Sequence, residues 1–342
     1  MTLEAGLPER SLPARIGLAH EGLYGFLREL ADAVMVVARD MGSEARDVST
    51  AAEEAEVDVV LAIGSVFLYP DLVARPRTAR RVLWYTEPLP RMTGSSGGIH
   101  DLLPTGRLLD VSRRVLPPLA RTAAWRRWRE KAANVREPMH NLVQLRRHAA
   151  AFDRIVIDAH ARARGAIAAG IPVDVVPFGY HPAFAGPIGA TVLRDIPVVA
   201  LGNVDPIARR YRITAALEDG LARSGVELAR IDGRVYGPAR RAMLERTQVL
   251  IDIQRIPGNY PLYNFLLAAA AGAALVTEPL LRPEPLVPGV HYVEADAFGL
   301  AQAALDLLAD EPRRLRMVEA AQALLTTDLD LRRTLPLALG WQ

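Results

Sequence analysis

The sequence predicts an α/β protein made of two doubly wound domains, each a parallel sheet with helices on both faces. Short runs of consecutive apolar residues recur along the chain, such as VDVVLAI (57–63) and VLIDI (249–253). Runs of this kind are typical of strands that are buried on both faces. Helix-like segments separate them, which favours a parallel sheet. A Pro/Gly-rich stretch after Val176 interrupts the rhythm before it restarts, so we expect two domains.

The composition is that of an ordinary globular protein. A chain of 342 residues, 50% hydrophobic and 23% charged, is long enough for two domains with sizeable cores. The net charge of +2 gives no general indication of a nucleic-acid partner. The absence of cysteine excludes disulfides and thiol chemistry. No signal-peptide core or transmembrane run of about 18 apolar residues is seen, so we expect a cytoplasmic protein.

The first half is expected to contain six strands, with helices between them. The strands are 15–19, 34–38, 57–63, 81–85, 153–158 and 173–176. Residues 23–33 are predicted to be helical because Leu23, Phe26, Leu27 and Leu30 recur at helical spacing. A helix over 161–169 should end at Gly170. The long Gly/Ser-containing stretch 92–118 is interpreted as a loop that is either functional or disordered, followed by one or two helices over 121–151.

The second half repeats this organisation. The expected strands are 197–201, 226–231, 249–253, 273–276 and 291–294, and the expected helices include 206–224, 238–247, 297–309 and 311–325. We expect residues 1–184 to form the first domain and 185–325 the second. The remaining segment, 326–342, is expected to pack back on the first domain.

One stretch, YPLYNFLLAAAAGAALVTEP (260–279), organises the second half. Its alanine-rich run favours a helix, Gly272 stands where a helix C-terminus is expected, and a short apolar strand follows. Small side chains allow this helix to lie close to its sheet. Its N-terminus would direct free N–H groups and a positive dipole end at an anionic ligand. Asn259, Tyr260 and Tyr263 are therefore candidate ligand-binding residues.

Several segments together resemble a known family. They are PVVAL followed by Gly202-Asn203, VYG (235–237), LIDIQR (250–255), AAGAALVTEPL (270–280), PGVHYV (288–293), VPFGYHP (176–182) and WYTEP (84–88). They look like GT-B glycosyltransferases, in particular the bacterial CgeB-like group within the family 1 and 4 type. The resemblance implies two Rossmann-like domains facing across a cleft. The C-terminal domain would hold a nucleotide-diphosphate sugar, and the N-terminal domain the acceptor.

The resemblance and the predicted strand ends indicate donor-binding residues. Gly202 and Asn203 would allow close backbone approach, and Arg209 or Arg210 would pair with the diphosphate. For the arginines, a solvated helix face is the alternative. The remaining candidates are Tyr236 and Gly237 at the nucleobase, Arg255 at phosphate or sugar, and Thr277 and Glu278 at sugar or ribose hydroxyls. The alternative for Tyr236 and Gly237 is a packing tyrosine beside a turn glycine, and the alternative for Arg255 is a surface salt bridge. For Thr277 and Glu278 it is a helix cap or a solvated carboxylate.

Two positions depart from the family pattern. Leu267 stands where retaining GT-B enzymes usually carry a glutamate, and Asn264 where the CgeB-like group often has an arginine. Leucine cannot accept hydrogen bonds from sugar or ribose hydroxyls. The departure therefore favours an inverting mechanism, a displaced donor contact, or a protein that binds without turnover.

An inverting transferase needs a base near the acceptor hydroxyl. His20 follows the first strand, where inverting GT-B enzymes often place that base, and Glu87 follows another strand of the same domain. Glu21 is a further rival, as is His100 if its loop closes as a lid. A structural histidine in a turn is the alternative for His20, and His181 is interpreted as a hinge contact.

A basic segment is the remaining feature with a possible partner. It contains Arg121, Arg126, Arg127, Arg129, Lys131, Arg136, Arg146 and Arg147, with Trp125 and Trp128 three residues apart. An anionic acceptor, a membrane surface or a nucleic acid could use it, and an amphipathic helix with solvated arginines is the alternative.

The sequence thus predicts a glycosyltransferase that moves a sugar from a nucleotide-diphosphate donor to an unknown acceptor, with inversion favoured. A catalytically silent GT-B-like binding or scaffold protein is the first alternative, and a sugar-nucleotide epimerase is the second. No metal-ligand cluster or Walker loop is present. We expect no metal or cofactor, since arginines and helix dipoles can stabilise the leaving diphosphate in this fold.

Overall fold

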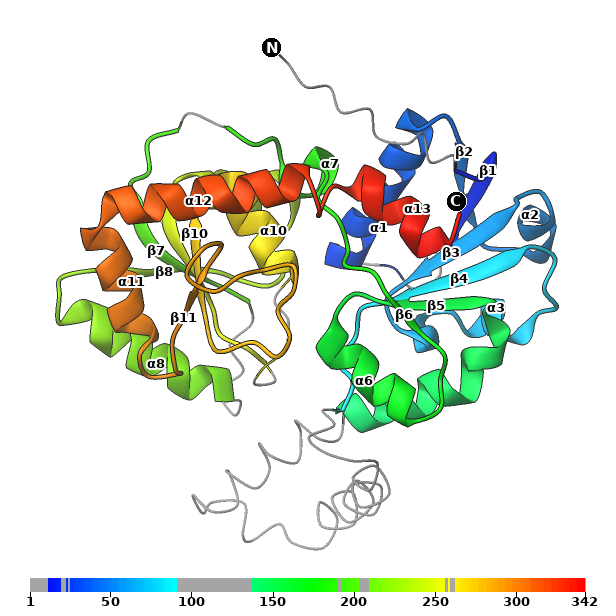
Figure 1. Cartoon of the computed structure of the whole chain (residues 1–342), viewed down its shortest axis with the longest axis horizontal. Helices are drawn as coiled ribbons and strands as arrows, with labels where there is room; N and C mark the ends of the chain where they lie inside the picture. Colours follow the sequence, from blue (N-terminus) through cyan, green and yellow to red (C-terminus); the bar gives the residue numbers. More distant parts are fainter. Residues whose placement is uncertain are drawn as a thin grey trace, which may run out of the picture.

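The chain folds into two parallel sheets with helices packed around each of them (Figure 1). The computed structural model describes residues 12–19, 23, 25–90, 137–189, 192–202, 209–255, 258 and 262–341. All structural statements below concern these residues. The two-sheet α/β architecture expected from the alternating apolar runs is confirmed.

The first sheet has six parallel strands in the order β2-β1-β3-β4-β5-β6. They are β1 (Arg15–Ala19), β2 (Glu44–Val48), β3 (Val59–Ile63), β4 (Arg80–Tyr85), β5 (Arg154–Ile157) and β6 (Asp174–Val175). The helices described with this sheet are α1 (Gly25–Asp40), α2 (Ala51–Ala55), α3 (Pro70–Ala74) and α6 (His160–Ala168), with short 3-10 turns at Val66–Leu68 and Ala149–Ala151. Residues 137–148 are also helical.

The predicted strand over residues 34–38 is wrong. These residues continue α1, whose buried side chains include Leu27, Leu30, Ala31, Val34 and Ala38 at helical spacing. The strand that follows is EARDV of β2, at the edge of the sheet, where only Ala45 and Val48 are buried. An edge strand buries fewer side chains than a central one, so its sequence is polar and does not stand out. The broadly buried α1 is apolar enough to resemble a strand.

The second sheet has five parallel strands in the order β11-β10-β9-β7-β8. They are β7 (Ile196–Leu201), β8 (Leu228–Ile231), β9 (Thr247–Asp252), β10 (Ala274–Thr277) and β11 (Val293–Glu294). The helices are α8 (Arg209–Ala222), α9 (Gly237–Glu245), α10 (Leu262–Ala271), α11 (Leu300–Ala309) and α12 (Glu311–Thr326). In each sheet the order reverses between the first and the third strand, β1 and β3 or β7 and β9. Ligands of doubly wound sheets bind at the carboxyl ends of strands near such switch points.

The expected helix, glycine and strand around Gly272 are confirmed. Gly272 has a φ of 76°, the left-handed conformation that glycine adopts without strain. Its N–H donates to Ala269 and that of Ala273 donates to Ala268, which is the Schellman pattern of a helix C-terminus. The α10 side chains from Phe265 to Ala271 are all buried. Helix α10 therefore passes directly into β10.

One cluster of buried apolar side chains is continuous across both sheets. It joins Leu61 and Trp84 of the first sheet to Leu250 and Leu275 of the second, through α1, α10 and α12. Two further clusters cover the outer face of each sheet separately. Helices α7 (Pro182–Ala185) and α13 (Leu331–Leu339) belong to the shared cluster, and α13 packs on α1 and β4. The last helix therefore lies on the first sheet (Figure 1).

The chain passes between the two sheets twice, at Tyr180 and at Asp330, and these residues form a parallel β-bridge. The Leu331 N–H donates to the Tyr180 carbonyl at 2.9 Å. A Cβ at Gly179 would lie 2.5 Å from the Cα of Leu331, so only glycine fits beside the second segment. The predicted junction around VPFGYHP is thus a paired crossing. His181 caps α7, where its Nδ1 accepts from the Ala183 N–H.

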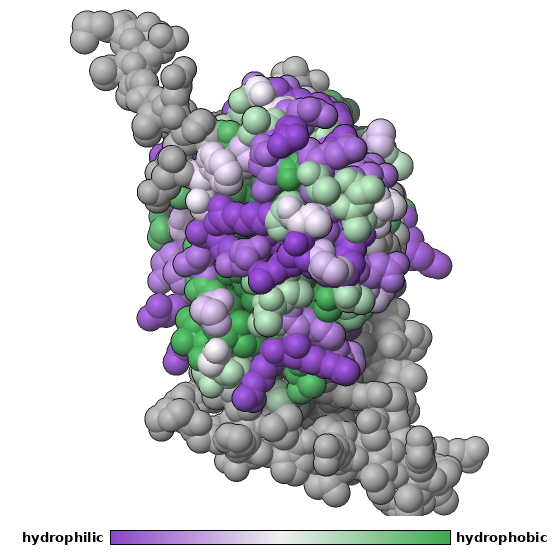
Figure 2. Space-filling view, turned by 90° about the vertical axis from the view of Figure 1, so that its right-hand side faces the viewer, coloured by the Kyte–Doolittle hydropathy of each residue, from purple (hydrophilic) through white to green (hydrophobic). Residues whose placement is uncertain are grey.

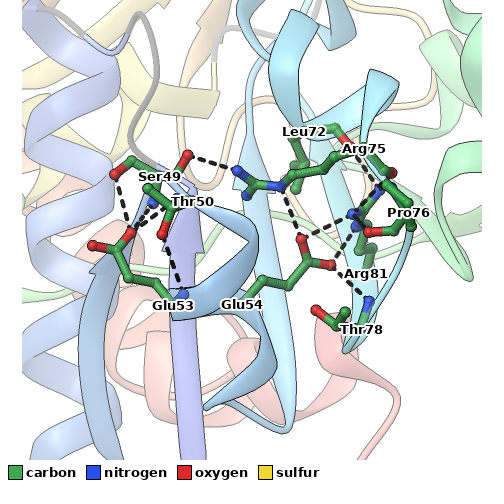
Figure 3. Close-up of polar contacts among 9 residues, drawn as sticks. All are labelled: Ser49, Thr50, Glu53, Glu54, Leu72, Arg75, Pro76, Thr78 and Arg81. Carbon is green, nitrogen blue, oxygen red and sulfur yellow. Dashed lines mark hydrogen bonds and ion pairs between the residues drawn. The ribbon is translucent and has the colours of Figure 1, made fainter.

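A buried ion pair stabilises the outer part of the first sheet (Figure 3). Glu54 of α2 accepts from the guanidinium of Arg81 on β4 at 2.7 and 2.8 Å, and from Arg75 at 3.0 Å. Both Glu54 and Arg81 are almost completely buried. Hydrophilic side chains cover much of the face of the molecule shown in Figure 2, with apolar ones between them. No helix in the described part of the chain is long and apolar enough to cross a membrane.

Candidate functional site

Charged and polar side chains gather where β7, β9 and β10 end. Arg209 and Arg210 begin α8, which follows β7, while Gln254 follows β9 and Glu278 follows β10. Parallel strands deliver their carboxyl ends to one edge of the sheet, which is why residues so distant in sequence meet here. We call these four residues, together with Gly202 and Asp252, the carboxyl-edge cluster.

Arg209 and Glu278 form a bidentate ion pair in the carboxyl-edge cluster. Arg209 Nη1 donates to Glu278 Oε2 at 2.8 Å, and Arg209 Nη2 donates to Glu278 Oε1. Arg209 Nη1 also donates to the carbonyl of Gln254 at 3.0 Å. Two residues that the sequence nominated separately, for the diphosphate and for hydroxyl groups, therefore bind each other in this structure.

Gln254 holds the ends of β9 and β10 together. Its backbone N–H donates to Glu278 Oε2 at 3.0 Å, and its side-chain amide donates to the Glu278 carbonyl at 2.6 Å. Its side-chain oxygen accepts from the backbone N–H of Gly258. Gln254 was not among the predicted site residues. Its place directly after VLIDI, one residue before Arg255, was a signal that could have identified it.

Arg210 lies against Gly202 at the end of β7. Its Nε donates to the Ile253 carbonyl at 2.7 Å. Gly202 has a φ of 122°, which favours glycine, and a Cβ there would lie 3.1 Å from Arg210 Nη1. Burial lowers the pKa of Arg210, while the charge of Asp252 raises it. A cation is thus held close to the backbone at the switch point of the second sheet.

Asp252 is a buried carboxylate that sequence reasoning missed. Its Oδ1 accepts from Asn264 Nδ2 at 2.6 Å and its Oδ2 from Thr277 Oγ1 at 3.2 Å. Burial raises the pKa of Asp252, and the nearby Arg210 lowers it. The acid inside the apolar run VLIDI was the available signal. Asn264 and Thr277 thus serve this carboxylate.

Tyr263, at the start of α10, points toward the first sheet. Its ring lies 4.7 Å from that of Phe26 on α1 and 5.9 Å from that of Phe178, measured between ring centroids. Burial raises the pKa of Tyr263 well above its ordinary value, as does the neighbouring carboxylate of Asp158. The structure thus places Tyr263 in the contact between the two domains.

Glu87 lies at the carboxyl edge of the first sheet beside a buried ion pair. Arg162 donates to both carboxylate oxygens of Asp158, at 2.6 and 2.7 Å, and to the Thr86 carbonyl at 2.7 Å. Burial raises the pKa of Glu87, and the charge of Arg162 opposes that rise. Glu87 is therefore a carboxyl group with an elevated pKa. It directly follows Thr86, whose carbonyl accepts from Arg162.

Arg255 links the two domains near Glu87. Its guanidinium forms an ion pair with Glu137, and both charges influence the pKa of Glu87 in opposite directions. The carboxyl edges of both sheets therefore approach each other here. Neither Asp158 nor Arg162 was predicted as a site residue. Asp158 stands at the end of a predicted strand, and the same kind of position led to the prediction of Glu87.

Tyr236 and Gly237, at the start of α9, also contact the first domain. The Gly237 N–H donates to Glu29 Oε1, and Arg240 donates to Glu29 Oε2 at 2.7 Å. The Tyr236 ring packs against Gly25, where a Cβ would lie 2.7 Å from the ring. The residues nominated for the nucleobase thus form an interdomain contact with α1.

Several predicted residues lie outside the described part of the chain. They are His20, Glu21, His100, Asn203, Asn259, Tyr260 and the basic segment from Arg121 to Arg136. In the described residues, no group of three or more His, Asp or Glu side chains could hold a metal ion.

An open pocket of about 730 Å³ lies at the amino-terminal edge of the first sheet, away from the carboxyl-edge cluster. Two of its arginines are already paired, Arg15 with Asp58 at 2.7 Å and Arg77 with Asp153 at 2.7 Å. Because ligands of doubly wound sheets bind at the opposite edge, we assign the pocket no functional role.

Comparison with known proteins identifies the fold. No family model matches the chain, and no curated protein matches it by sequence. Among solved structures, HepE from Anabaena in complex with UDP-glucose is 11% identical, with a TM-score of 0.56 over 95% of this chain and 98% of that one. An α-glucosyltransferase in complex with UDP and a 13-mer DNA is 8% identical, with a TM-score of 0.57 over 95% and 98%.

AviGT4, a glycosyltransferase involved in avilamycin A biosynthesis, is 14% identical, with a TM-score of 0.52 over 96% of this chain and 100% of that one. The likeness extends over nearly the whole of each chain. The fold is therefore that of GT-B glycosyltransferases, as the resemblance implied. The narrower likeness to the CgeB-like group stays a prediction.

Proposed function

We propose that this protein is a glycosyltransferase that moves a sugar from a nucleotide-diphosphate donor to a hydroxyl group of an acceptor. The observation that carries the proposal is the position of Arg209 and Arg210 at the switch point of the second sheet. UDP-glucose and UDP are bound in solved structures of the same fold. Residues 185–325 would hold the donor and residues 1–184 the acceptor, with 326–342 attached to the first domain.

The donor would lie along the carboxyl edge of the second sheet. Arg209 and Arg210 would neutralise the diphosphate, since a guanidinium matches phosphate oxygens. Gly202 and Asn203 would allow the backbone to approach it closely. The further donor contacts we propose are Thr277 and Glu278 at hydroxyl groups, Arg255 at phosphate or sugar, Tyr236 and Gly237 at the nucleobase, and Asn259, Tyr260 and Tyr263 at the start of α10.

The reaction would be a base-assisted displacement with inversion at the sugar. Glu87 is the described candidate base, and His20 is the rival in the same domain. The base removes the proton of the acceptor hydroxyl, and that oxygen forms a bond to the anomeric carbon. The bond from this carbon to the diphosphate oxygen breaks, and the diphosphate leaves with the electron pair. We assign no metal or cofactor to this step, because the arginines supply the positive charge.

The acceptor is proposed to be anionic, because the basic segment belongs to the acceptor side of the chain. Arg146 and Arg147 are its described members, in the helical residues 137–148. Charge neutralisation by such a segment would be weakened by salt.

Thermal-shift measurements with UDP, GDP, dTDP and their sugar conjugates test the proposal. We expect at least one nucleotide to raise the melting temperature, because a ligand bound only by the folded state stabilises it. Replacing Arg209 and Arg210 with alanine should abolish that shift. Arg313, an exposed arginine of α12, replaced with alanine is the matched control. No stabilisation by any nucleotide would contradict the proposal.

A catalytically silent binding protein is the second candidate, and the burial of Leu267 favours it. Leu267 lies in the shared apolar cluster, where the family usually carries a glutamate. Release of nucleoside diphosphate from a bound nucleotide sugar, with water or acceptor extracts, separates the two candidates. Binding without release would support the silent protein.

A further inference from the structure

The carboxylate of Glu278 binds the guanidinium of Arg209, which the proposed function assigns to the diphosphate. Both oxygens of Glu278 accept from Arg209, in the two-point geometry by which a guanidinium also holds a phosphate. The Glu278 side chain is 5% exposed and that of Arg209 is 19% exposed. Arg209 is therefore the more accessible member of the pair.

A diphosphate that binds the same Nη1–Nη2 edge of the Arg209 guanidinium must displace Glu278. The released carboxylate would keep the backbone N–H of Gln254, at 3.0 Å, as its partner. It would lose its two hydrogen bonds to Arg209 while remaining in a largely buried place. A buried carboxylate that has lost its cationic partner is costly, so displacement by an anion alone is unfavourable.

We propose that Glu278 competes with the diphosphate for Arg209, and so restricts the site to ligands that carry hydroxyl groups beside their diphosphate. The inference rests on the proposed function, since it concerns the same donor site. Ribose hydroxyls of a ribonucleoside diphosphate donate hydrogen bonds to the released carboxylate and replace those it loses. Inorganic pyrophosphate has no such groups and meets the full cost of displacement. Glu278 is thus a specificity-determining residue.

Calorimetric titration of the full chain with inorganic pyrophosphate tests the competition. Glu278→Gln removes the competing charge, and we expect it to bind pyrophosphate at least about tenfold more tightly than the wild type. Glu245→Gln is the matched control, because it changes the net charge equally but removes an ion pair with Arg241 on α9. Equal or weaker pyrophosphate binding by Glu278→Gln than by the wild type would overturn the inference, as would an equal gain in the control.

Titration with UDP and GDP and with their 2′,3′-dideoxy analogues tests the hydroxyl requirement. The wild type should prefer the ribonucleotide that it binds over the dideoxy form by about tenfold, and Glu278→Gln should lose that preference. An unchanged preference in the variant would overturn the inference while leaving the proposed function intact. Tighter pyrophosphate binding in the variant, with no nucleotide bound by either protein, would support the competition and overturn the proposed function.

Circular dichroism establishes whether Glu278→Gln is folded. If it is not, Glu278→Asp replaces it in both titrations. Aspartate keeps the charge but is one methylene shorter, so it cannot hold the two-point contact with Arg209. We expect tighter pyrophosphate binding for this variant too, and no gain would overturn the inference.

Discussion

Glu87 combines burial with a specific cationic neighbour, as expected of a group with a tuned pKa. Burial raises its pKa above the ordinary value, and the charge of Arg162 limits that rise. If Glu87 is the base, donor turnover should increase with pH as the carboxyl group ionises. The acidic limb of the pH profile should then lie above pH 4.5, the ordinary value for glutamate.

Two variants test this assignment. Glu87→Gln should lower turnover by about 10²- to 10⁴-fold, because general-base catalysis contributes about that much. Arg162→Gln should move the acidic limb to higher pH, since the charge that lowers the pKa of Glu87 is gone. The measurement is diphosphate release across pH, with Glu218→Gln as an exposed control. Full activity of Glu87→Gln would exclude Glu87 and leave His20 as the candidate base.

Removal of the Glu54 carboxylate should cost substantial stability. Burial would raise its pKa, but the hydrogen bonds and charge of Arg81, with help from Arg75, outweigh burial and lower it. Glu54→Gln would leave the guanidinium of Arg81 buried without its counter-charge. Breaking a buried pair in this way costs about 3–5 kcal/mol, which urea denaturation can measure.

The pH dependence of stability provides an independent check on Glu54. Because its folded-state pKa lies below its unfolded value of 4.5, the contribution is fully present above pH 4.5 and is lost as the pH falls through the folded-state value. The Glu54→Gln variant should lack this part of the acid dependence. Glu56→Gln, which disrupts an exposed pair with Arg46, should cost less than about 1 kcal/mol. Similar losses for both variants would contradict the account.

At the scale of elements, the paired crossing at Tyr180 and Asp330 depends on Gly179. A methyl group at residue 179 would lie 2.5 Å from the backbone of Leu331, so the two segments would have to separate. Gly179→Ala should therefore destabilise the protein by about 1–3 kcal/mol, the usual cost of overpacking. Gly299→Ala is the control, because a Cβ there meets its nearest atoms at 3.6 Å. Equal unfolding midpoints for the two variants would contradict this interpretation.

Prediction of elements from sequence succeeded where a strand lies in the middle of a sheet. β3 and β7 are apolar throughout, and β9 has the apolar run Val249 to Ile251 at its centre, because both faces of these strands are covered. Their sequences are therefore distinctive. It failed for β2, a polar edge strand, and for the second half of α1, whose Val34 to Ala38 lies in the core shared by both domains.

The sequence predicted several residues of the candidate site, but not which of their side chains contact each other. Strand ends identified Arg209, Glu278 and Glu87, because the carboxyl edge of a parallel sheet follows from chain order alone. Nothing in the sequence shows that Arg209 would bind Glu278, or that Tyr263 would turn toward Asp158 across the domain contact. Those contacts depend on how the two sheets are placed relative to each other.

At the scale of the whole molecule, the shared apolar cluster predicts that both domains unfold together. Leu61 and Trp84 belong to the same cluster as Leu250 and Leu275, so neither sheet can lose its inner layer alone. Differential scanning calorimetry should therefore show one transition whose calorimetric and van't Hoff enthalpies agree. Two resolved transitions would contradict a common core.

The central claim is that a nucleotide diphosphate binds at the carboxyl edge of the second sheet. A crystal structure of the protein soaked with the nucleotide that gives the largest thermal shift tests it most directly. We expect the diphosphate within hydrogen-bonding distance of Arg209 or Arg210, with the Arg209–Glu278 ion pair broken. A nucleotide bound elsewhere, with that ion pair intact, would contradict it.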